Sequence, residues 1–217
     1  MYQALIFDLD GTLLDTITDI TDAINRALEE CGYDYSYDRE STKTLIGDGS
    51  DTLIRRALRE KSGDVDAFSE LNRAYMPLYL AYQNKHTKPF PGIEEALEEL
   101  KKAGISLFIV SNKPDHLVQD LIPRYFRSGL FTECHGIKAG ERVKPDPHQV
   151  NGIIKKYDLD KHKVLYVGDS KPDILVSKNA GVDCALCTWG YGNYLDPECK
   201  EAKYSVKEPK FLLSIAL

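Results

Sequence analysis

Four short and uninterrupted runs of apolar residues constrain the fold of this chain more than any other feature. They are ALIFDLD at 4–10, ISLFIVSN at 105–112, HKVLYVGD at 162–169 and VDCALCTW at 182–189. Runs of this length are typical of strands that are buried on both faces, as in a parallel sheet. Helical patterns separate them; in one, Ile93, Leu97 and Leu100 fall on a single helical face. The alternation predicts an α/β fold with a doubly wound, Rossmann-like parallel sheet.

Residues 16–86 interrupt this alternation. They contain several helical patterns but no clear strand, and the sequence HTKPFPG, with two prolines and a glycine, marks their end. We therefore expect an α/β core made of residues 1–15 and 87–217. A small α-helical cap domain would be inserted into this core at 16–86.

The composition excludes several classes of protein. The 217 residues carry a net charge of −6, which argues against the basic surface that nucleic-acid binding requires. No apolar run could span a bilayer and the N-terminus lacks the features of a secretory signal, so we expect a cytoplasmic protein without a membrane partner. We interpret Cys184 and Cys187 as buried thiols, because no second zinc-spaced pair accompanies them. No feature of the sequence indicates the oligomeric state. We expect a monomer or a weak homodimer.

Polar side chains follow the apolar runs at the points where the strands should end. They are Asp8 and Asp10 after the first run, Ser111 and Asn112 after the second, and Asp169 and Asp173 after the third, with Lys144 in RVKPDP before a helical pattern. The carboxyl ends of parallel strands meet at one edge of a sheet, so these side chains should converge on one site. Clustered carboxylates with a lysine suit phosphoryl chemistry, in which Mg²⁺ and an ammonium group hold phosphate oxygens.

Helix-start signals accompany these polar residues. Thr12-x-x-Asp15 and Ser170-x-x-Asp173 both have the form of a capping box, and Asn112 is a candidate N-cap of the following helix. The amide groups at a helix N-terminus bind phosphate oxygens. We therefore expect helix starts beside the candidate site.

Four motifs occur in order along the chain: Asp8-x-Asp10-Gly-Thr12, Ser111-Asn112, Lys144-Pro145 and Gly168-Asp169-Ser170-x-x-Asp173. With these motifs, the chain resembles the haloacid dehalogenase superfamily of aspartate-nucleophile phosphatases. The stretches IGDGSDTLIRRAL, SNKP and WGYG resemble its phosphoglycolate phosphatase-like branch, which has a helical cap after the first motif.

The resemblance implies different tasks for the first two aspartates. Asp8 would be the nucleophile that attacks phosphorus and forms an aspartyl-phosphate. Asp10 would protonate the leaving alkoxide and later accept a proton from the hydrolytic water. This assignment is chemically reasonable, because a carboxylate can serve as a covalent nucleophile when nearby cations cancel its repulsion from phosphate.

The resemblance also implies a Mg²⁺ cofactor. Its ligands would be Asp8, the backbone carbonyl of Asp10, and Asp169, with Asp173 supporting the set from further out. The residues that hold phosphate oxygens or position the nucleophile would be Thr12, Ser111, Asn112 and Lys144.

The implied function is a Mg²⁺-dependent phosphomonoester hydrolase of small phosphorylated metabolites, and 2-phosphoglycolate is the first candidate substrate. A pyrophosphatase, a nucleotidase or a phosphotransferase similar to β-phosphoglucomutase would use the same fold. A catalytically silent binding protein should lack Asp8, Asp10 or Lys144, and all three are present. The glycines around Asp48 predict a loop near the cap–core boundary, and we expect changes at Asp48 or Gly49 to alter substrate ranking.

Overall fold

The chain divides into two compact units. The structure, a computed structural model, describes residues 1–217. One unit, here called the α/β unit, comprises residues 1–14 and 89–217; the other, the helical unit, comprises residues 15–88. Each unit is described by itself.

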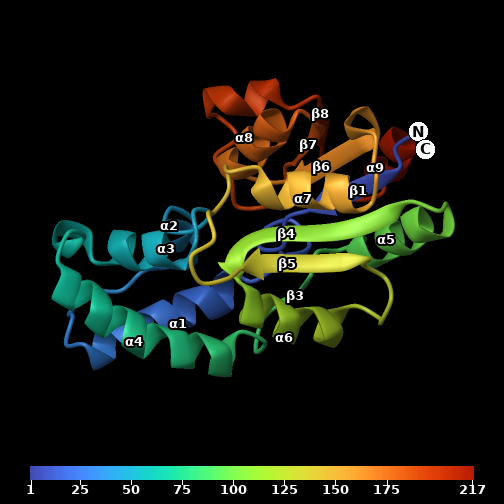
Figure 1. The fold of residues 1–217 in the computed structure, drawn as a ribbon. Coiled ribbons are helices and arrows are strands. Elements are labelled where there is room, and N and C mark those ends of the chain that lie inside the picture. The colour runs from blue at the N-terminus through green and yellow to red at the C-terminus, as the bar shows by residue number, and fades with distance from the viewer. The chain divides into compact units, whose positions relative to one another are not determined.

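A sheet of six parallel strands forms the centre of the α/β unit, in the order β5-β4-β1-β6-β7-β8 (Figure 1). The strands are β1 (Ala4–Phe7), β4 (Ser106–Pro114), β5 (Glu133–Ile137), β6 (Val164–Gly168), β7 (Asp183–Cys187) and β8 (Tyr204–Val206). The first strand in the sequence lies between β4 and β6, so that chain segments far apart in sequence reach the sheet edge beside it. The predicted doubly wound parallel sheet is confirmed.

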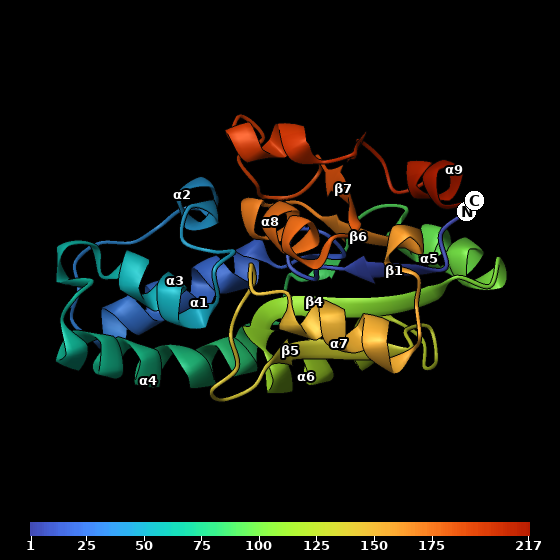
Figure 2. The same cartoon turned by 45° about the horizontal axis from the view of Figure 1, so that its top comes forward.

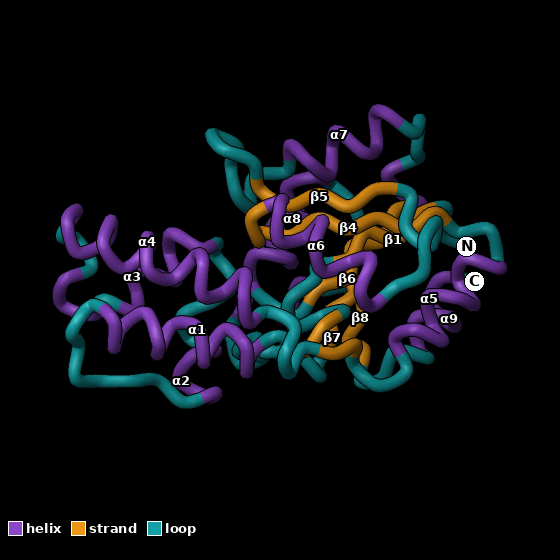
Figure 3. The backbone as a smooth tube through the Cα atoms, turned by 90° about the horizontal axis from the view of Figure 1, so that it is seen from below, coloured by secondary structure: helices purple, strands orange, loops and turns teal.

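Helices cover both faces of this sheet (Figure 3). They are α5 (Ile93–Lys102), α6 (Asp115–Tyr125), α7 (His148–Lys156), α8 (Lys171–Ala180) and α9 (Phe211–Ala216). Along β1, Leu5 and Phe7 pack into the cluster that includes α5, α6 and α9, whereas Ala4 and Ile6 pack with α7 and α8. Alternate residues of a strand point to opposite faces, so a strand covered on both faces must be apolar throughout.

The two ends of the chain lie side by side, as Figures 1 and 2 show. The amide of Tyr2 donates a hydrogen bond of 2.9 Å to the carbonyl of Ala216, which ends α9. The C-terminal helix is thereby fixed to the start of the central strand, and both belong to the α/β unit.

Two strands of the sheet, β5 and β8, were not expected from the sequence. Their sequences, ECHGI and YSV, have no continuous apolar run. Both lie at the edges of the sheet, where a strand has one neighbour and is less completely covered. Their half-buried side chains therefore need less apolar character than those of the four central strands, and the pattern that identified the central strands does not apply to them.

The helical unit consists of α1 (Ile17–Glu30), α2 (Arg39–Lys43), α3 (Ser50–Ala57) and α4 (Val65–Tyr82), with a short 3₁₀ turn at Arg59–Lys61. Helices α1 and α4 pack against each other in opposite directions (Figures 1 and 2). Helix α1 ends at Glu30, with Cys31 at the C-cap position, and Gly32 follows it with a positive φ of 77°, which favours glycine. The strands β2 (Leu14–Asp15) and β3 (Lys88–Pro89) pair where the chain passes between the units. No helix combines the length and apolar composition needed to cross a membrane.

Candidate active site

Asp8 and Asp10 diverge at the carboxyl end of β1. The amide of Asp8 still belongs to the ladder and donates a 2.9 Å hydrogen bond to the Val167 carbonyl of β6. The chain then turns, and Gly11 adopts a φ of 86°, which favours glycine. A Cβ atom at Gly11 would overlap the Asp169 carboxylate, so the turn is also closely packed against the next motif.

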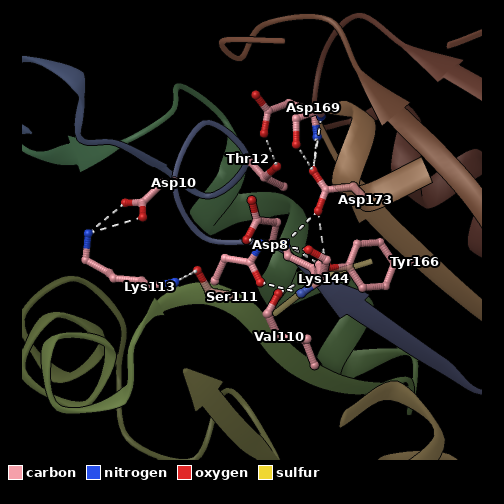
Figure 4. A network of polar contacts seen from close by, with 12 residues as sticks. Asp8, Asp10, Thr12, Val110, Ser111, Lys113, Lys144, Tyr166, Asp169 and Asp173 are labelled. Atoms are coloured by element: carbon pink, nitrogen blue, oxygen red, sulfur yellow. Dashed lines mark hydrogen bonds and ion pairs between the residues drawn. The ribbon is translucent and has the colours of Figure 1, made fainter. Parts of the chain in front are cut away.

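Lys144 joins two carboxylates at this edge of the sheet (Figure 4). Its Nζ atom lies 2.8 Å from Oδ1 of Asp8 and 2.7 Å from Oδ1 of Asp173, and its side chain is only 3% exposed. It also donates to the Tyr166 hydroxyl at 3.1 Å, and that hydroxyl donates to the Val110 carbonyl at 3.0 Å. A lysine recruited from the loop between β5 and α7 therefore supplies the nearest positive charge to Asp8.

Asn112 positions the backbone of this loop. Its Oδ1 accepts a 2.7 Å hydrogen bond from the Lys144 amide, and its Nδ2 donates to the Lys144 carbonyl at 3.3 Å. The prediction that Asn112 is an N-cap is wrong, because α6 begins only at Asp115, with Pro114 at the N-cap position. The side chain instead satisfies two backbone groups of a loop distant in sequence.

Asp173 forms the expected capping box with Ser170 at the start of α8. Its Oδ2 accepts hydrogen bonds from the amide and the hydroxyl of Ser170, at 3.0 Å and 2.6 Å. Since its other oxygen faces Lys144, both oxygens of Asp173 are engaged within the protein. Asp173 therefore organises the site while it starts a helix.

The Thr12–Asp15 capping box, by contrast, does not form. Helix α1 begins at Ile17, with Thr16 at its N-cap position. The Thr12 hydroxyl donates to Asp169 at 3.0 Å, and Asp15 forms an ion pair with Arg39. The Thr12 hydroxyl, which the local sequence pattern assigned to a helix start, is therefore hydrogen-bonded to Asp169, a residue far away in the sequence.

Asp169 is enclosed by a glycine-containing loop. Its Oδ2 accepts hydrogen bonds from the amides of Tyr191 and Gly192 at 2.7 Å and 3.2 Å, while its Oδ1 accepts from Thr12. A Cβ atom at Gly190 or Gly192 would overlap Asp169, so only glycine permits this approach. The WGYG stretch thus contributes backbone donors to the site.

Burial and charge repulsion determine the ionisation of the carboxyl groups. Burial raises the pKa of Asp8 from its usual 3.8 to about 7, although the Lys144 ammonium acts in the opposite direction. Burial, followed by repulsion from Asp173 and Asp8, raises the pKa of Asp169 to about 8. Burial of Lys144 would lower its pKa, but attraction to Asp173 and Asp8 outweighs it and the pKa lies well above 10.5.

The donor set fits a divalent cation. Carboxylate oxygens of Asp8, Asp169 and Asp173 lie within 4.8 Å of one another, and all three residues are buried. Together with Asp10, they face two ammonium groups, so the site carries two uncompensated negative charges when all four carboxyl groups are ionised. Hard cations prefer such oxygen ligands, and a nearby cation would lower the pKa of each raised carboxyl group.

Three features of the site were missed by sequence reasoning. They are the lysine of SNKP, Lys113, which pairs with Asp10; the hydroxyl of Tyr166; and the amides of Tyr191 and Gly192. Each left a signal in the sequence: the lysine lies in SNKP and the amides in WGYG, and the tyrosine is a polar group within an otherwise apolar strand. Ser111, which was expected at the site, lies on β4 beside Lys113, is 2% exposed and accepts its amide hydrogen at 3.2 Å.

The parallel sheet and its cluster of acidic residues define a known class of hydrolase. Residues 5–187 match the family model described as haloacid dehalogenase-like hydrolase, and the chain belongs to this family.

Two similar sequences and one similar crystal structure show which members of this family the chain resembles. The chain is 34% identical over 196 residues to a phosphoglycolate phosphatase of Vibrio parahaemolyticus, covering 88% of this chain and 86% of that protein. It is 33% identical over 203 residues to phosphoglycolate phosphatase 1 of Pseudomonas aeruginosa, covering 92% and 74%. A crystal structure from Lactobacillus delbrueckii subsp. bulgaricus superposes with a TM-score of 0.91 at 30% identity, covering 100% of this chain and 98% of that one.

Proposed function

We propose that this protein is a Mg²⁺-dependent phosphatase of small phosphorylated metabolites that works through an aspartyl-phosphate. The observation that carries the proposal is the buried contact between Asp8 and Lys144 beside Asp169 and Asp173. A nucleophilic carboxylate needs neighbouring cations before it can approach a phosphate dianion. Family membership supports the hydrolytic chemistry.

The reaction proceeds in two displacements. An oxygen of Asp8 forms a bond to phosphorus while the bond from phosphorus to the leaving oxygen breaks, and Asp10 delivers a proton to that oxygen. The oxygen of a water molecule then forms a bond to phosphorus while Asp10 accepts a proton from this water. The bond from phosphorus to the Asp8 oxygen breaks, which regenerates the Asp8 carboxylate and releases inorganic phosphate. Lys144, with Thr12, Ser111 and Asn112, orients Asp8 and phosphate oxygens during both steps.

Asp8, the Asp10 carbonyl and Asp169 would hold Mg²⁺, and Asp173 would support them through Ser170 and Lys144. When bound, the cation supplies charge neutralisation at the phosphoryl oxygens. One oxygen of Asp173 pairs with the Lys144 ammonium group, and the other accepts a hydrogen bond from the Ser170 amide. Since both oxygens are engaged, Asp173 is better suited to support the metal ligands than to bind the cation directly. Asp169 already has its geometry fixed by Thr12 and two backbone amides.

The first candidate substrate is 2-phosphoglycolate, because the similar proteins from Vibrio parahaemolyticus and Pseudomonas aeruginosa are named phosphoglycolate phosphatases. We propose that residues 16–86 act as a cap that selects the leaving group. Within this helical unit, Gly47 and Gly49 have positive φ angles, and Asp48 forms a 2.5 Å ion pair with Arg56. The expectation that changes at Asp48 or Gly49 alter substrate ranking stays a prediction.

A screen over a panel of phosphate esters tests this function. The purified protein is assayed with 2-phosphoglycolate, sugar phosphates, nucleotides and pyrophosphate, in the presence of Mg²⁺ and in EDTA. Release of phosphate that requires Mg²⁺, greatest for 2-phosphoglycolate, would support the proposal. If the protein prefers pyrophosphate or nucleotides, the proposed substrate is wrong. Full activity in EDTA would refute the role of the cation.

A further inference from the structure

Asp10 has its own lysine. The Nζ atom of Lys113 lies 3.0 Å from Oδ1 and 3.1 Å from Oδ2 of Asp10. The lysine side chain is 3% exposed and the aspartate side chain 20% exposed. The ammonium group therefore contacts both oxygens of one carboxylate, a more restrictive geometry than the single contact of most surface ion pairs.

The backbone that carries Lys113 is fixed by the sheet. Its amide donates to the Ser111 hydroxyl at 3.2 Å. Beside it, Gly136 of β5 approaches so closely that a Cβ atom there would lie 2.6 Å from the Lys113 carbonyl. The amide of Gly136 also donates to Asp115 at 3.0 Å. Lys113 thus projects from the last residues of β4, where the pairing with β5 changes register and close backbone contacts surround it.

The two lysines separate the two neighbouring aspartates. Figure 4 shows the Asp8 carboxylate with Lys144 and the Asp10 carboxylate turned aside toward Lys113. Two carboxylates two residues apart in one turn repel each other. A separate positive charge for each fixes their directions, and their proposed tasks require different directions: one oxygen must reach phosphorus and the other the leaving group.

We propose that Lys113 is a positioning residue that holds the Asp10 carboxylate in the orientation needed for proton transfer. This inference rests on the proposed phosphatase function and extends it to a residue outside the four motifs. Lys144 lies against Asp8 and Asp173, whereas the ammonium group of Lys113 contacts both oxygens of Asp10. Misplacement of an acid by about 1 Å can cost on the order of 100-fold in rate.

A double-mutant cycle tests the proposal. Lys113→Met, Asp10→Asn and the combined variant are compared with wild type, using 2-phosphoglycolate as a substrate that needs leaving-group protonation and p-nitrophenyl phosphate as one that needs little. We expect Lys113→Met to lower kcat about 10- to 100-fold for the first substrate and less for the second, with a small change in KM. In the Asp10→Asn background the same change should have little further effect, because residues that act as a unit are not additive.

Several outcomes would overturn the inference. Additive losses in the double variant would show that Lys113 acts independently of Asp10. An increase in KM confined to 2-phosphoglycolate, retained in the Asp10→Asn background, would make Lys113 a ligand of the substrate carboxylate instead. An inactive wild-type protein would refute the proposed function itself, which distinguishes the two failures.

Three further variants control for loss of folding and for the removal of a lysine in general. Lys113→Arg keeps a positive charge that can contact both oxygens, so it should recover part of the lost kcat; no recovery would contradict positioning by charge. Lys102→Met removes an exposed lysine that pairs with Glu99 and should leave activity unchanged. If Lys113→Met unfolds, as judged by circular dichroism, Lys113→Gln takes its place in the cycle.

Discussion

Lys144 lies 2.8 Å from Asp8 at the carboxyl edge of the sheet, although the two residues come from opposite halves of the chain. The same ammonium lies 2.7 Å from Asp173. Because Lys144 is almost completely buried, its charge has no substitute in solvent, and both carboxylates depend on it. This relationship carries a direct expectation for mutagenesis.

Lys144→Met should reduce both turnover and stability. Removal of one partner of a buried ion pair typically costs about 3–5 kcal/mol, because the remaining charge is left uncompensated. We expect kcat to fall at least about 100-fold, since the nucleophile loses its cation. Activity assays and urea unfolding would measure the two effects. Lys155→Met, an exposed lysine on α7, provides the control, and equal behaviour of the two variants would contradict the role of Lys144.

Amide variants of the two aspartates should fail differently. Asp8→Asn removes the nucleophile, so neither phosphoenzyme nor product should form. Asp10→Asn keeps the nucleophile but loses the general acid, which typically costs about 10²–10⁴ in rate. It should form phosphoenzyme faster from p-nitrophenyl phosphate than from an alkyl phosphate and then stall at hydrolysis. Rapid-quench trapping measures this step, and phosphoenzyme in the Asp8 variant would reverse the assignments.

The raised carboxyl pKa values predict an unusual dependence of stability on pH. In EDTA, Asp8 and Asp169, with pKa values of about 7 and 8, retain protons that the unfolded chain loses near 3.8. The folded protein then binds more protons, so the free energy of unfolding should fall as pH rises from about 5 to 8. Mg²⁺ should therefore raise Tm more at pH 8 than at pH 5.

Thermal unfolding at several pH values, with Mg²⁺ and with EDTA, measures this effect. Asp169→Asn is the matched variant: in EDTA its Tm should depend less on pH, and its response to Mg²⁺ should be reduced. A wild-type Tm in EDTA that rises over this range would show that the two carboxyl groups are ionised without a cation.

Gly192→Ala should disturb the cation site without touching a carboxylate. The added methyl group would overlap the backbone of Asp169, and overpacking of this kind typically costs about 1–3 kcal/mol. We expect a lower Tm and weaker Mg²⁺ binding by calorimetry. Gly152→Ala in α7 is the control, because no atom lies near its Cβ position. Alanine stabilises a helix by about 1 kcal/mol relative to glycine, so this variant should not lower Tm. Unchanged Mg²⁺ affinity in Gly192→Ala would show that the loop around Gly192 does not contribute to the cation site.

Much of the α/β unit was predictable because its signals are local. Continuous apolar runs identified the four inner strands, and helical periodicity identified the main helices between them. The edge strands β5 and β8 were missed, since partial exposure allows mixed side chains there. The capping box of Ser170 and Asp173 formed, whereas that of Thr12 and Asp15 did not, because Asp169 is a tertiary competitor for the Thr12 hydroxyl.

The sequence by itself determined the order along the chain of the four inner strands and the helices between them, and it placed the acidic motifs at strand ends, because both follow from patterns among contiguous residues. Only the tertiary structure decided which lysine serves which aspartate, pairing Lys144 with Asp8 and Lys113 with Asp10. It also decided that glycine-loop amides enclose Asp169. The physical reason is that ion pairs and hydrogen bonds depend on distance through space, which separation along the chain does not fix.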